Sequence, residues 1–519
     1  MATCSYPGCD CEIYQGDKCI FHCEKTEQNG WISPDGKTNG NVHLFWSKFE
    51  KIVREKSEYN FTFTRGYIIP QYKTGDTRGL EHLDEIIFKE CTFVDSFDFI
   101  ASKTKQFSVV NSKIEKPFRV DAIRGEGKNA YVQIFDSEIN HNVFFFGNSR
   151  TILDKCTLDK NVKINIWGCP KDSFIEIKSI NNQALNGEII IQQILAGNIT
   201  INQVNINKLK INEIHIPEEG KFIIDFCKIN LLRFADFGNL GKNAKIKNSV
   251  IHDALYFNNV DLSDISFNNF DISECACLFN KVNIVNARLN SVFWTKKENS
   301  GSKSIWQRLK LELKPEVVFL KKFDLENFKK IIETEDIIFT KGATDKNKIV
   351  HFDKIIPKEE FIDIVTQLKI NYDNCGQYDL ANKFYCLEMN LRKDNCDSFF
   401  QKLVFHINSF ISSFGQSYIK ALFVLLLSVA IASSFYEGCF NNLLDIITKV
   451  CNNYDGTRFV LEKIIPFLNG AVSFILPFAY SDHFSFMTKG HEFIGFLYII
   501  WCSIVVWHII ISVKRINKR

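Results

Sequence analysis

Residues 255–294 read LYFNNVDLSDISFNNFDISECACLFNKVNIVNARLNSVFW, and this stretch decides the fold. Every fifth residue is apolar at eight consecutive positions: Phe257, Leu262, Phe267, Ile272, Cys277, Val282, Ala287 and Val292. A second column, two residues earlier, is apolar at six of its eight positions: Leu255, Val260, Ile265, Phe270, Cys275, Asn280, Val285 and Asn290. Neither a helix nor a hairpin has a five-residue period, whereas a square coil with one face per five residues does. Stacked coils of this kind bury a continuous core, and the Asn and Asp residues between the columns suit their corners.

The pattern loosens upstream of this stretch. Runs such as VQIFDSEINHNVFFF (132–146) and ITINQVNINKLKINEIHI (199–216) alternate apolar and polar residues, as strands do, without a fixed step of five. We therefore predict a β-solenoid over residues 86–295, with a β-sandwich as the main alternative. Residues 31–85 are predicted to form a bridge, with a helix over 41–59 followed by an alternating strand.

The first thirty residues are rich in cysteine. Cys4, Cys9, Cys19 and His22 form the pattern C-x4-C-x9-C-x2-H. Three thiolates and one imidazole in a closed tetrahedral set are typical ligands of structural zinc, and four protein ligands leave no open position for catalysis. Further cysteines lie beside the set, so the identity of the four ligands stays open. We predict a zinc knuckle over residues 1–30; the alternative is a Cys-rich segment without metal.

Two amphipathic segments precede the C-terminal apolar region. Segments 359–371 and 377–393 carry apolar residues at helical spacing, and Gly376 between them is a natural helix stop. The runs 306–314 and 325–332 also look helical. We assign residues 300–400 to a helical adaptor in which segments 359–371 and 377–393 pack against each other.

Three apolar runs indicate a transmembrane unit over residues 403–519. The last, 493–513, has no Asp, Glu, Lys or Arg and spans ~31 Å as a helix, the thickness of a bilayer core. Residues 421–436 form a first, slightly short span. Residues 464–480 contain two prolines and an Asn-Gly pair, which favours a re-entrant helix over a third span, the alternative. We predict two spans with a re-entrant helix between them.

Residues 255–294 resemble the pentapeptide-repeat family, whose fold is a right-handed quadrilateral β-helix. The segment LKINYDNCGQYDLANKFYCLEMNLRK (368–393) resembles the one that membrane-bound members carry before their transmembrane helices. In that family a Cys/His knuckle, the repeats, this hairpin and a two-helix channel-like end occur together, in the order found here. The resemblance implies a mainly β fold: a right-handed β-solenoid with a zinc knuckle, a helical adaptor and C-terminal transmembrane helices.

The membrane unit also resembles the two-helix ion-channel superfamily. Where a potassium filter such as TVGYG would follow the middle helix, this chain has FAYSDHFSF (478–486), so potassium selectivity is not predicted. Two helices cannot enclose a water path, so a pore requires a homo-oligomer. The candidate pore residues are Ser428, Ser433, Ser434, Asn469, Ser473 and Asp482. A ring of Asp482 carboxylates favours cations. The alternative is that the serines only allow close helix packing.

Basic residues indicate the topology. Lys393, Lys402 and Lys420 precede the first span, and four Lys or Arg residues follow the last. Both termini are then predicted to be cytoplasmic, in a multi-pass protein of the plasma (inner) membrane. The loop 437–492 would lie outside, where oxidising conditions permit a disulfide between Cys439 and Cys451. Two free thiols are the alternative.

Composition narrows the functional class. The chain has 519 residues, 24% of them charged, and a net charge of +3, too balanced to indicate a nucleic-acid partner. No nucleophile–base arrangement, P-loop or suitable carboxylate pair indicates an enzyme. The first hypothesis is an oligomeric ion channel gated through a cytosolic β-solenoid that senses a protein or small-molecule trigger. The alternatives are a non-conducting, membrane-anchored scaffold that binds a protein partner, and a triggered membrane effector of a prokaryotic defence system.

Overall fold

The computed structural model describes most of the chain. The described residues are 2–32, 40–56, 60–63, 66–73, 80, 83–101, 104–122, 130–159, 161–182, 187–238, 240, 242–294, 358–437 and 492–517. The chain falls into two compact units. The first consists of Met1–Glu298 and Phe319–Asn371, and the second consists of Asn299–Val318 and Tyr372–Arg519.

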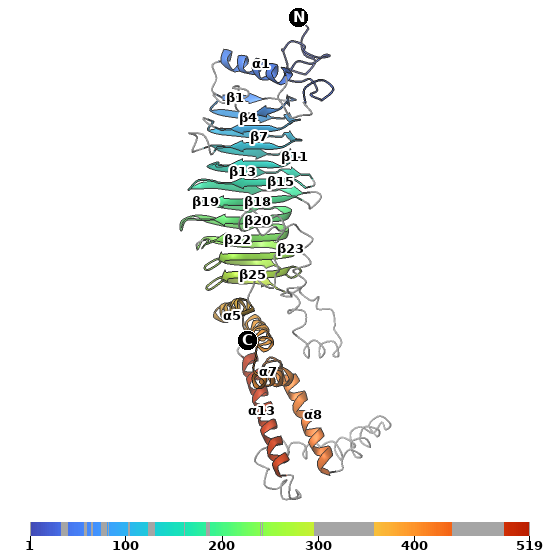
Figure 1. Ribbon diagram of the computed structural model, residues 1–519, viewed down its shortest axis with the longest axis vertical. Coiled ribbons are helices and arrows are strands. Elements are labelled where there is room, and N and C mark those ends of the chain that lie inside the picture. Colours follow the sequence, from blue (N-terminus) through green and yellow to red (C-terminus); the bar gives the residue numbers. More distant parts are fainter. Residues whose placement is uncertain are drawn as a thin grey trace, which may run out of the picture. The chain divides into compact units, whose positions relative to one another are not determined.

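The first unit is a parallel β-solenoid of about nine turns, built from 26 strands (Figure 1). One face carries β1 (Asn60–Phe63), β4 (Glu85–Lys89), β7 (Gln106–Val110), β10 (Tyr131–Phe135), β13 (Arg150–Asp154), β16 (Ser173–Lys178), β19 (Ala196–Asn202), β21 (Lys221–Asp225), the start of β23 (Ala244–Asp261), β24 (Ser266–Asp271) and β26 (Arg288–Phe293). The second carries β2 (Ile68–Ile69), β5 (Thr92–Phe93), β8 (Lys113–Ile114), β11 (Glu138–Ile139), β14 (Thr157–Leu158), β17 (Asn181–Asn182) and the first residues of β20 (Asn205–Ile214) and β22 (Lys228–Phe237). The third carries β3 (Tyr72–Lys73), β6 (Phe97–Ile100), β9 (Phe118–Asp121), β12 (Val143–Phe146), β15 (Lys163–Trp167), β18 (Glu188–Ile194), the remainder of β20, β22 and β23, and β25 (Ala276–Asn283).

Every pairing between these described strands is parallel and joins one turn to the next, as in β4 with β7 and β7 with β10. This pairing confirms the predicted solenoid and excludes the β-sandwich, whose sheets are antiparallel. Side chains alternate between the interior and the surface along many of the strands; β16, for example, buries every second residue. The inward residues of successive turns stack into one core. The ring centroids of Phe234 and Phe257 lie 5.1 Å apart, and those of Phe257 and Phe279 lie 5.4 Å apart.

The five-residue pattern predicted which side chains point inward but not the length of a turn. All eight residues of the first column are buried, whereas Val285 and Asn290 of the second column are exposed. Ala254 pairs with Ala276, which is 22 residues later. Four faces of five residues would repeat after 20. Phe257 therefore stacks on Phe279, and the prediction of one face per five residues is wrong for this part of the coil.

The corner after the first face follows a repeated rule. The residue that follows β7 or β10 has a left-handed backbone, with φ of 47° at Asn111 and 50° at Asp136. Asn and Asp tolerate this conformation better than most residues. The next residue points inward: Ser112 Oγ accepts a hydrogen bond from the Cys91 N–H at 2.9 Å and donates to the Val110 carbonyl at 2.8 Å. Each such serine ties two turns together.

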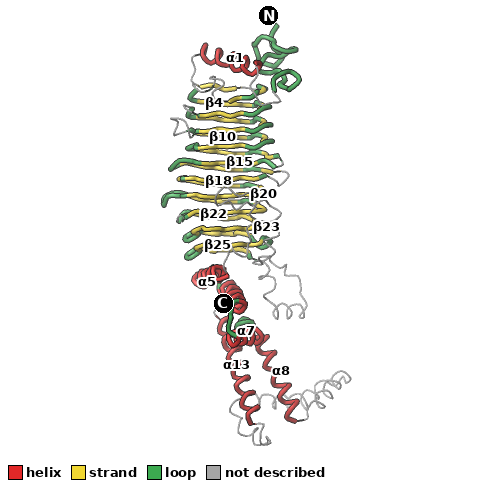
Figure 2. The backbone as a smooth tube through the Cα atoms, in the orientation of Figure 1, coloured by secondary structure: helices red, strands yellow, loops and turns green. Residues whose placement is uncertain are grey.

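Helix α1 (Gly40–Lys56) lies at the N-terminal end of the solenoid (Figure 2). Its apolar side buries Phe45, Trp46 and Phe49, and Trp46 Nε1 donates to the Gln71 carbonyl at 2.9 Å. The helix predicted over 41–59 is therefore present. The parallel ladder already begins at Asn60, where β1 pairs with β4, so the solenoid starts earlier than the predicted residue 86.

Helix α5 (Lys358–Asn374) contacts the last turn of the solenoid through residues of the same unit. Gln367 Oε1 accepts from the Ile284 N–H at 3.0 Å, and Asn371 Oδ1 accepts from the Asn286 N–H at 3.2 Å. Asn371 Nδ2 also donates to the Ile284 carbonyl. These bonds satisfy backbone groups at the last described turn of the solenoid. The predicted runs 306–314 and 325–332 lie outside the described residues.

Replacing Asn371 with leucine should destabilise this end of the solenoid. Asn371 is buried, and the substitution leaves the Asn286 N–H without its partner and the Ile284 carbonyl with the Ala287 N–H alone. We expect a loss of about 1–3 kcal/mol in the free energy of local opening, the cost of unsatisfied buried groups. Hydrogen exchange at the Asn286 amide measures it. Asn371→Asp keeps the acceptor and should retain most of the protection of the Asn286 amide. Equal exchange of this amide in the leucine and aspartate variants would contradict the proposed role of the Asn371 side chain.

The second unit contains four described helices: α6 (Tyr378–Asp394), α7 (Phe399–Ser412), α8 (Tyr418–Glu437) and α13 (Glu492–Asn517). Helices α5 and α6 agree with the segments predicted at 359–371 and 377–393. A cluster formed by Ile411, Ala421, Val424, Leu425, Cys502 and Val505 joins α7, α8 and α13. Among the described residues one helix, Phe496–Arg515, is long and apolar enough to cross a membrane, and Tyr418–Val429 is a shorter apolar segment.

Candidate metal centre

The N-terminal residues fold into tight turns that place four side chains together. Short antiparallel bridges join Thr3 to Glu12 and Gln15 to Lys18. Gly16 has φ +62°, a conformation open to glycine, between the two halves of the second bridge. The following turn, closed by the His22 N–H to the Cys19 carbonyl at 3.1 Å, brings those two side chains to the same side.

The predicted ligands form a compact cluster. We call Cys4, Cys9, Cys19 and His22 the Cys/His cluster; its ligand atoms all lie within 4.8 Å of one another. Cys9 Sγ is 3.6 Å from Cys19 Sγ, Cys19 Sγ is 3.2 Å from His22 Nδ1, and Cys4 Sγ is 3.6 Å from the same nitrogen. A tetrahedral site with metal–sulfur bonds of ~2.3 Å has edges of ~3.8 Å. The cluster therefore has the size and the ligand types of a four-coordinate metal site.

The structure distinguishes this cluster from Cys23 and also from Cys11, whose thiol interacts with Cys9 and Cys19 but is not one of the four members. The buried Cys23 Sγ lies 3.6 Å from the Ile20 carbonyl oxygen, to which it donates. Cys11 is partly exposed and is not among the four. The spacing argument, which left the set open, is thus resolved in favour of Cys4, Cys9, Cys19 and His22 as the residues that can hold a metal.

Burial and hydrogen bonds set the charge state of the thiols. Burial raises the pKa of Cys9 to about 11 and that of Cys19 to about 12. Burial alone would also raise the pKa of Cys4, but hydrogen bonds from the backbone N–H groups of Cys19 and Tyr6 outweigh it, and the pKa of that thiol is lowered. The Cys19 N–H lies 3.2 Å from Cys4 Sγ. Without a metal, Cys9 and Cys19 therefore keep their protons at neutral pH.

The cluster is joined to the first turn of the solenoid. The Tyr6 and His22 rings stack at 4.0 Å with an interplanar angle of 6°, and the Tyr67 ring meets His22 edge-on at 4.9 Å. The Ile68 N–H donates to the Phe21 carbonyl at 2.9 Å. A metal bound here would hold the N-terminal turns against the end of the solenoid, which is a structural role.

The predicted pore residues have mixed outcomes. Ser428 Oγ accepts from Trp501 Nε1 at 2.9 Å and donates to the Val424 carbonyl at 2.7 Å, so it links α8 to α13 within one chain. Ser433 and Ser434 lie on α8, but their side chains are not described. Asn469, Ser473, Asp482, Cys439 and Cys451 all lie outside the described residues.

A polar cluster in the second unit was not predicted. His508 is buried on α13; its Nδ1 lies 2.8 Å from Ser412 Oγ and its Nε2 lies 3.0 Å from Asn408 Oδ1. Near the end of the same helix, the Arg515 guanidinium donates to the Phe414 carbonyl. A lone histidine in an apolar run was the only sequence signal for these contacts, because its partners lie about a hundred residues away.

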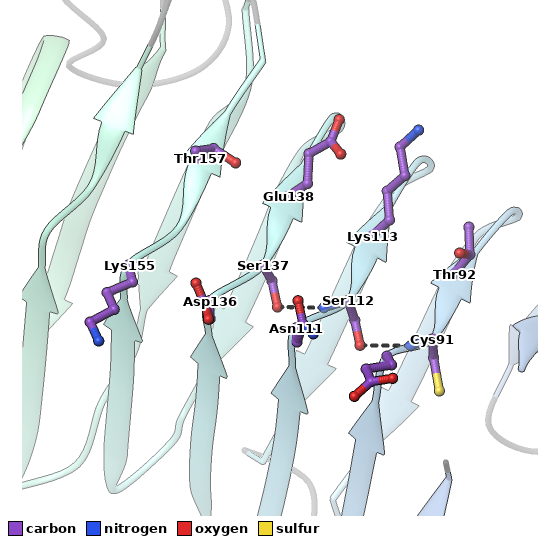
Figure 3. A pocket seen from close by; sticks show the side chains of 11 residues that line it. Cys91, Thr92, Asn111, Ser112, Lys113, Asp136, Ser137, Glu138, Lys155 and Thr157 are labelled. Carbon is purple, nitrogen blue, oxygen red and sulfur yellow. Dashed lines mark hydrogen bonds between the residues drawn. The ribbon is translucent and has the colours of Figure 1, made fainter. Parts of the chain in front are cut away.

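A polar groove of about 390 Å³ runs along one corner of the solenoid (Figure 3). It is lined by Glu90, Cys91, Thr92, Asn111, Ser112, Lys113, Asp136, Ser137, Glu138, Lys155 and Thr157. Figure 3 shows two rows of outward side chains, one from the left-handed corner residues and one from the strands that follow. Charges of both signs occur along the groove, so it fits a polar ligand better than an apolar one.

Comparison with protein-family models, with curated proteins and with solved structures found no match. The function of the chain is therefore argued from its own contacts.

Proposed function

We propose that the chain is an integral membrane protein that presents a metal-capped β-solenoid at the plasma (inner) membrane. The observation that carries this proposal is the exposed apolar surface of α8 and α13. Trp507 is 61% exposed and Phe423 59%, and both belong to helices that consist mainly of large apolar residues. Exposed apolar area of this extent favours transfer into lipid at roughly 25 cal/mol per Å².

The charges at the helix ends support a membrane topology. Lys420 lies in the first turn of α8, and Lys514 and Arg515 lie in the last turn of α13. Both positions suit phospholipid headgroups on the same side. We propose that both helices span the membrane and that both termini and the solenoid are cytoplasmic.

The solenoid is proposed to be right-handed and to bind the partner of the protein. Connections between parallel strands of one sheet are right-handed in about 98% of cases, which supports the handedness. The polar groove around Ser112 and Ser137 is the candidate site for a small-molecule or peptide trigger, because it is hollow and offers donors and acceptors from several turns.

The test of membrane insertion is alkaline extraction. Cells that express the full chain are lysed, and their membranes are washed at high pH, which strips proteins held by charge alone. We expect the chain to stay in the membrane pellet. A double variant, Ile504→Lys with Ile510→Lys, places two cations on exposed positions of α13 and should reduce insertion, since each costs roughly 2.5–3.5 kcal/mol near the bilayer centre. Release of the unaltered protein would contradict the proposal.

We assign zinc to the Cys/His cluster, in a structural role. Zinc binds thiolates, so it must displace the protons that Cys9 and Cys19 hold at neutral pH. We expect the zinc affinity to rise by at least roughly 100-fold per pH unit between about pH 6 and pH 8, because Cys9 and Cys19 each release a proton on binding. Competition with a chelator at several pH values measures the slope. An affinity independent of pH would contradict the assignment.

An oligomeric ion channel is the second candidate function. The observation that favours it is the uncharged run 464–480 with its two prolines, which a simple anchor does not need. In a homo-oligomer, Asp482 would form a ring of carboxylates that favours cations. Flux assays in liposomes should show conductance in the native chain and a changed cation preference in Asp482→Asn. A purified chain that stays monomeric and passes no ions supports the scaffold, while conductance only after a stimulus in bacterial membranes supports the triggered effector.

A further inference from the structure

Helix α7 exposes a large apolar face. The side chains on this face are Phe399, Phe400, Leu403, Val404 and Phe410. Two of them, Phe399 and Phe400, are 73% and 76% exposed, the highest values among the exposed large apolar residues. A face of this size on a helix of a soluble protein would be covered by other parts of the protein.

The C-terminal half of α7 is fixed to the two apolar helices. Ile411 lies in the cluster that joins α7 to α8 and α13, and Ser412 and Asn408 contact His508 of α13. Lys420 Nζ, at the start of α8, donates to the Ser409 carbonyl at 2.8 Å. These contacts hold α7 at the ends of α8 and α13 that carry the basic residues, so its apolar face adjoins theirs.

The length of α7 decides how it can meet a membrane. Its 14 residues extend ~21 Å, too short for a hydrocarbon core of ~30 Å. The chain then turns through the left-handed residues Ser413, Phe414 and Gly415 before α8 begins. A short amphipathic helix next to membrane spans lies in the interface, with its apolar face among the upper parts of the lipid chains.

The charge around α7 indicates which lipids it meets. No Asp or Glu occurs between Asp397 and Glu437, a stretch whose charged residues are Lys402 and Lys420. Lys402 is exposed on α7 itself, whereas Lys420 is engaged with carbonyl and hydroxyl oxygens. Lys402 is therefore available to a headgroup phosphate, and α7 has no carboxylate that would repel that phosphate.

We propose that α7 is an interfacial helix that docks onto anionic phospholipids, with Phe399, Phe400 and Leu403 inserted and Lys402 bound to a headgroup phosphate. This rests on the proposed membrane insertion of α8 and α13. It goes further in naming the lipid class and the residues that recognise it.

The test uses the full chain in vesicles of phosphatidylcholine with phosphatidylglycerol. A photoreactive phenylalanine analogue is placed at position 400 or, as the matched control, at position 405. Phe405 is half-buried on the same helix, with its ring 6.4 Å from that of Phe414. We expect lipid adducts when the analogue is at position 400 and no lipid adducts when it is at position 405. Crosslinks from position 400 to a second copy of the chain, or to protein in general, would overturn the proposal.

A second variant tests the headgroup. Lys402→Gln should lower the enrichment of phosphatidylglycerol among the adducts by about fivefold, the factor for roughly 1 kcal/mol per lysine near an anionic surface. Lys383→Gln, at an exposed lysine of α6, should leave the enrichment unchanged. Equal enrichment in Lys402→Gln and the native chain would overturn the phosphate contact. Alkaline extraction of the same vesicles separates the two proposals: a chain that resists extraction without adducts refutes only the docking of α7, whereas an extracted chain refutes membrane insertion.

Discussion

Replacing Cys19 with serine is expected to abolish stoichiometric zinc binding and to release the N-terminal turns from the solenoid. Cys19 is fully buried, and its sulfur is the neighbour of both Cys9 Sγ and His22 Nδ1. Loss of a direct ligand should lower the affinity by more than the roughly 10–100-fold that removal of an outer partner costs. Because metal binding and folding are coupled in small metal sites, the turns should then lose their order.

The consequence should reach the first turn of the solenoid. Phe21 packs edge-on against Phe45 of α1 at 5.2 Å, and its carbonyl accepts the Ile68 N–H. We expect faster hydrogen exchange at Ile68 and in α1, and no change near Phe257. The matched control is Cys23→Ser, a buried thiol of the same segment that lies outside the cluster. It should keep one zinc per chain; loss of zinc in Cys23→Ser but not in Cys19→Ser would show that the ligands are assigned wrongly.

The second large effect is expected at Phe97, in the aromatic core of the first turns. Its side chain is 1% exposed, and its ring stacks on Phe118 at 5.1 Å and meets Tyr72 at 5.1 Å. Phe97→Ala should lower the free energy of unfolding by about 3–5 kcal/mol, because the burial of the ring is lost and a cavity remains in its place. Because neighbouring turns support one another, the loss should extend to adjacent turns.

Phe226→Ala is the control for this change. Phe226 is 58% exposed at a corner of the same solenoid, so its removal should change the free energy of unfolding by no more than about 0.5 kcal/mol. Urea unfolding of both variants, followed by circular dichroism, gives the comparison. Similar losses for the two variants would contradict a continuous core that contains Phe97.

The inward positions of the solenoid were predictable because they follow from local alternation. Phe257 and Phe267 belong to a column that sequence alone marks as apolar, and both are buried. The turn length was not predictable, because it depends on how many residues each corner takes up. The two-residue strands β2 and β5 are too short to show any period, which is why the beginning of the solenoid was placed too late.

The candidate metal site was more predictable than the candidate pore residues. Its four residues lie within nineteen residues of one another, so spacing and residue type predicted them, although the choice between them and the neighbouring cysteines required the structure. The edge-on contact of Tyr67 with His22 was not predicted, because the two residues are 45 positions apart in the sequence. In the second unit, Ser428 was proposed as a pore residue because it is polar within an apolar helix, and that role stays a prediction. Its contact with Trp501 was not predicted, because it joins two helices that are distant in sequence.

Membrane insertion with a cytoplasmic solenoid is the central claim, and protease protection in sealed vesicles tests it most directly. The native chain is placed in inverted inner-membrane vesicles, whose cytoplasmic face is outside, and treated with trypsin. We predict that the solenoid is digested and that fragments containing α8 and α13 are protected until detergent is added. Complete digestion without detergent, or protection of the whole chain, would contradict the account.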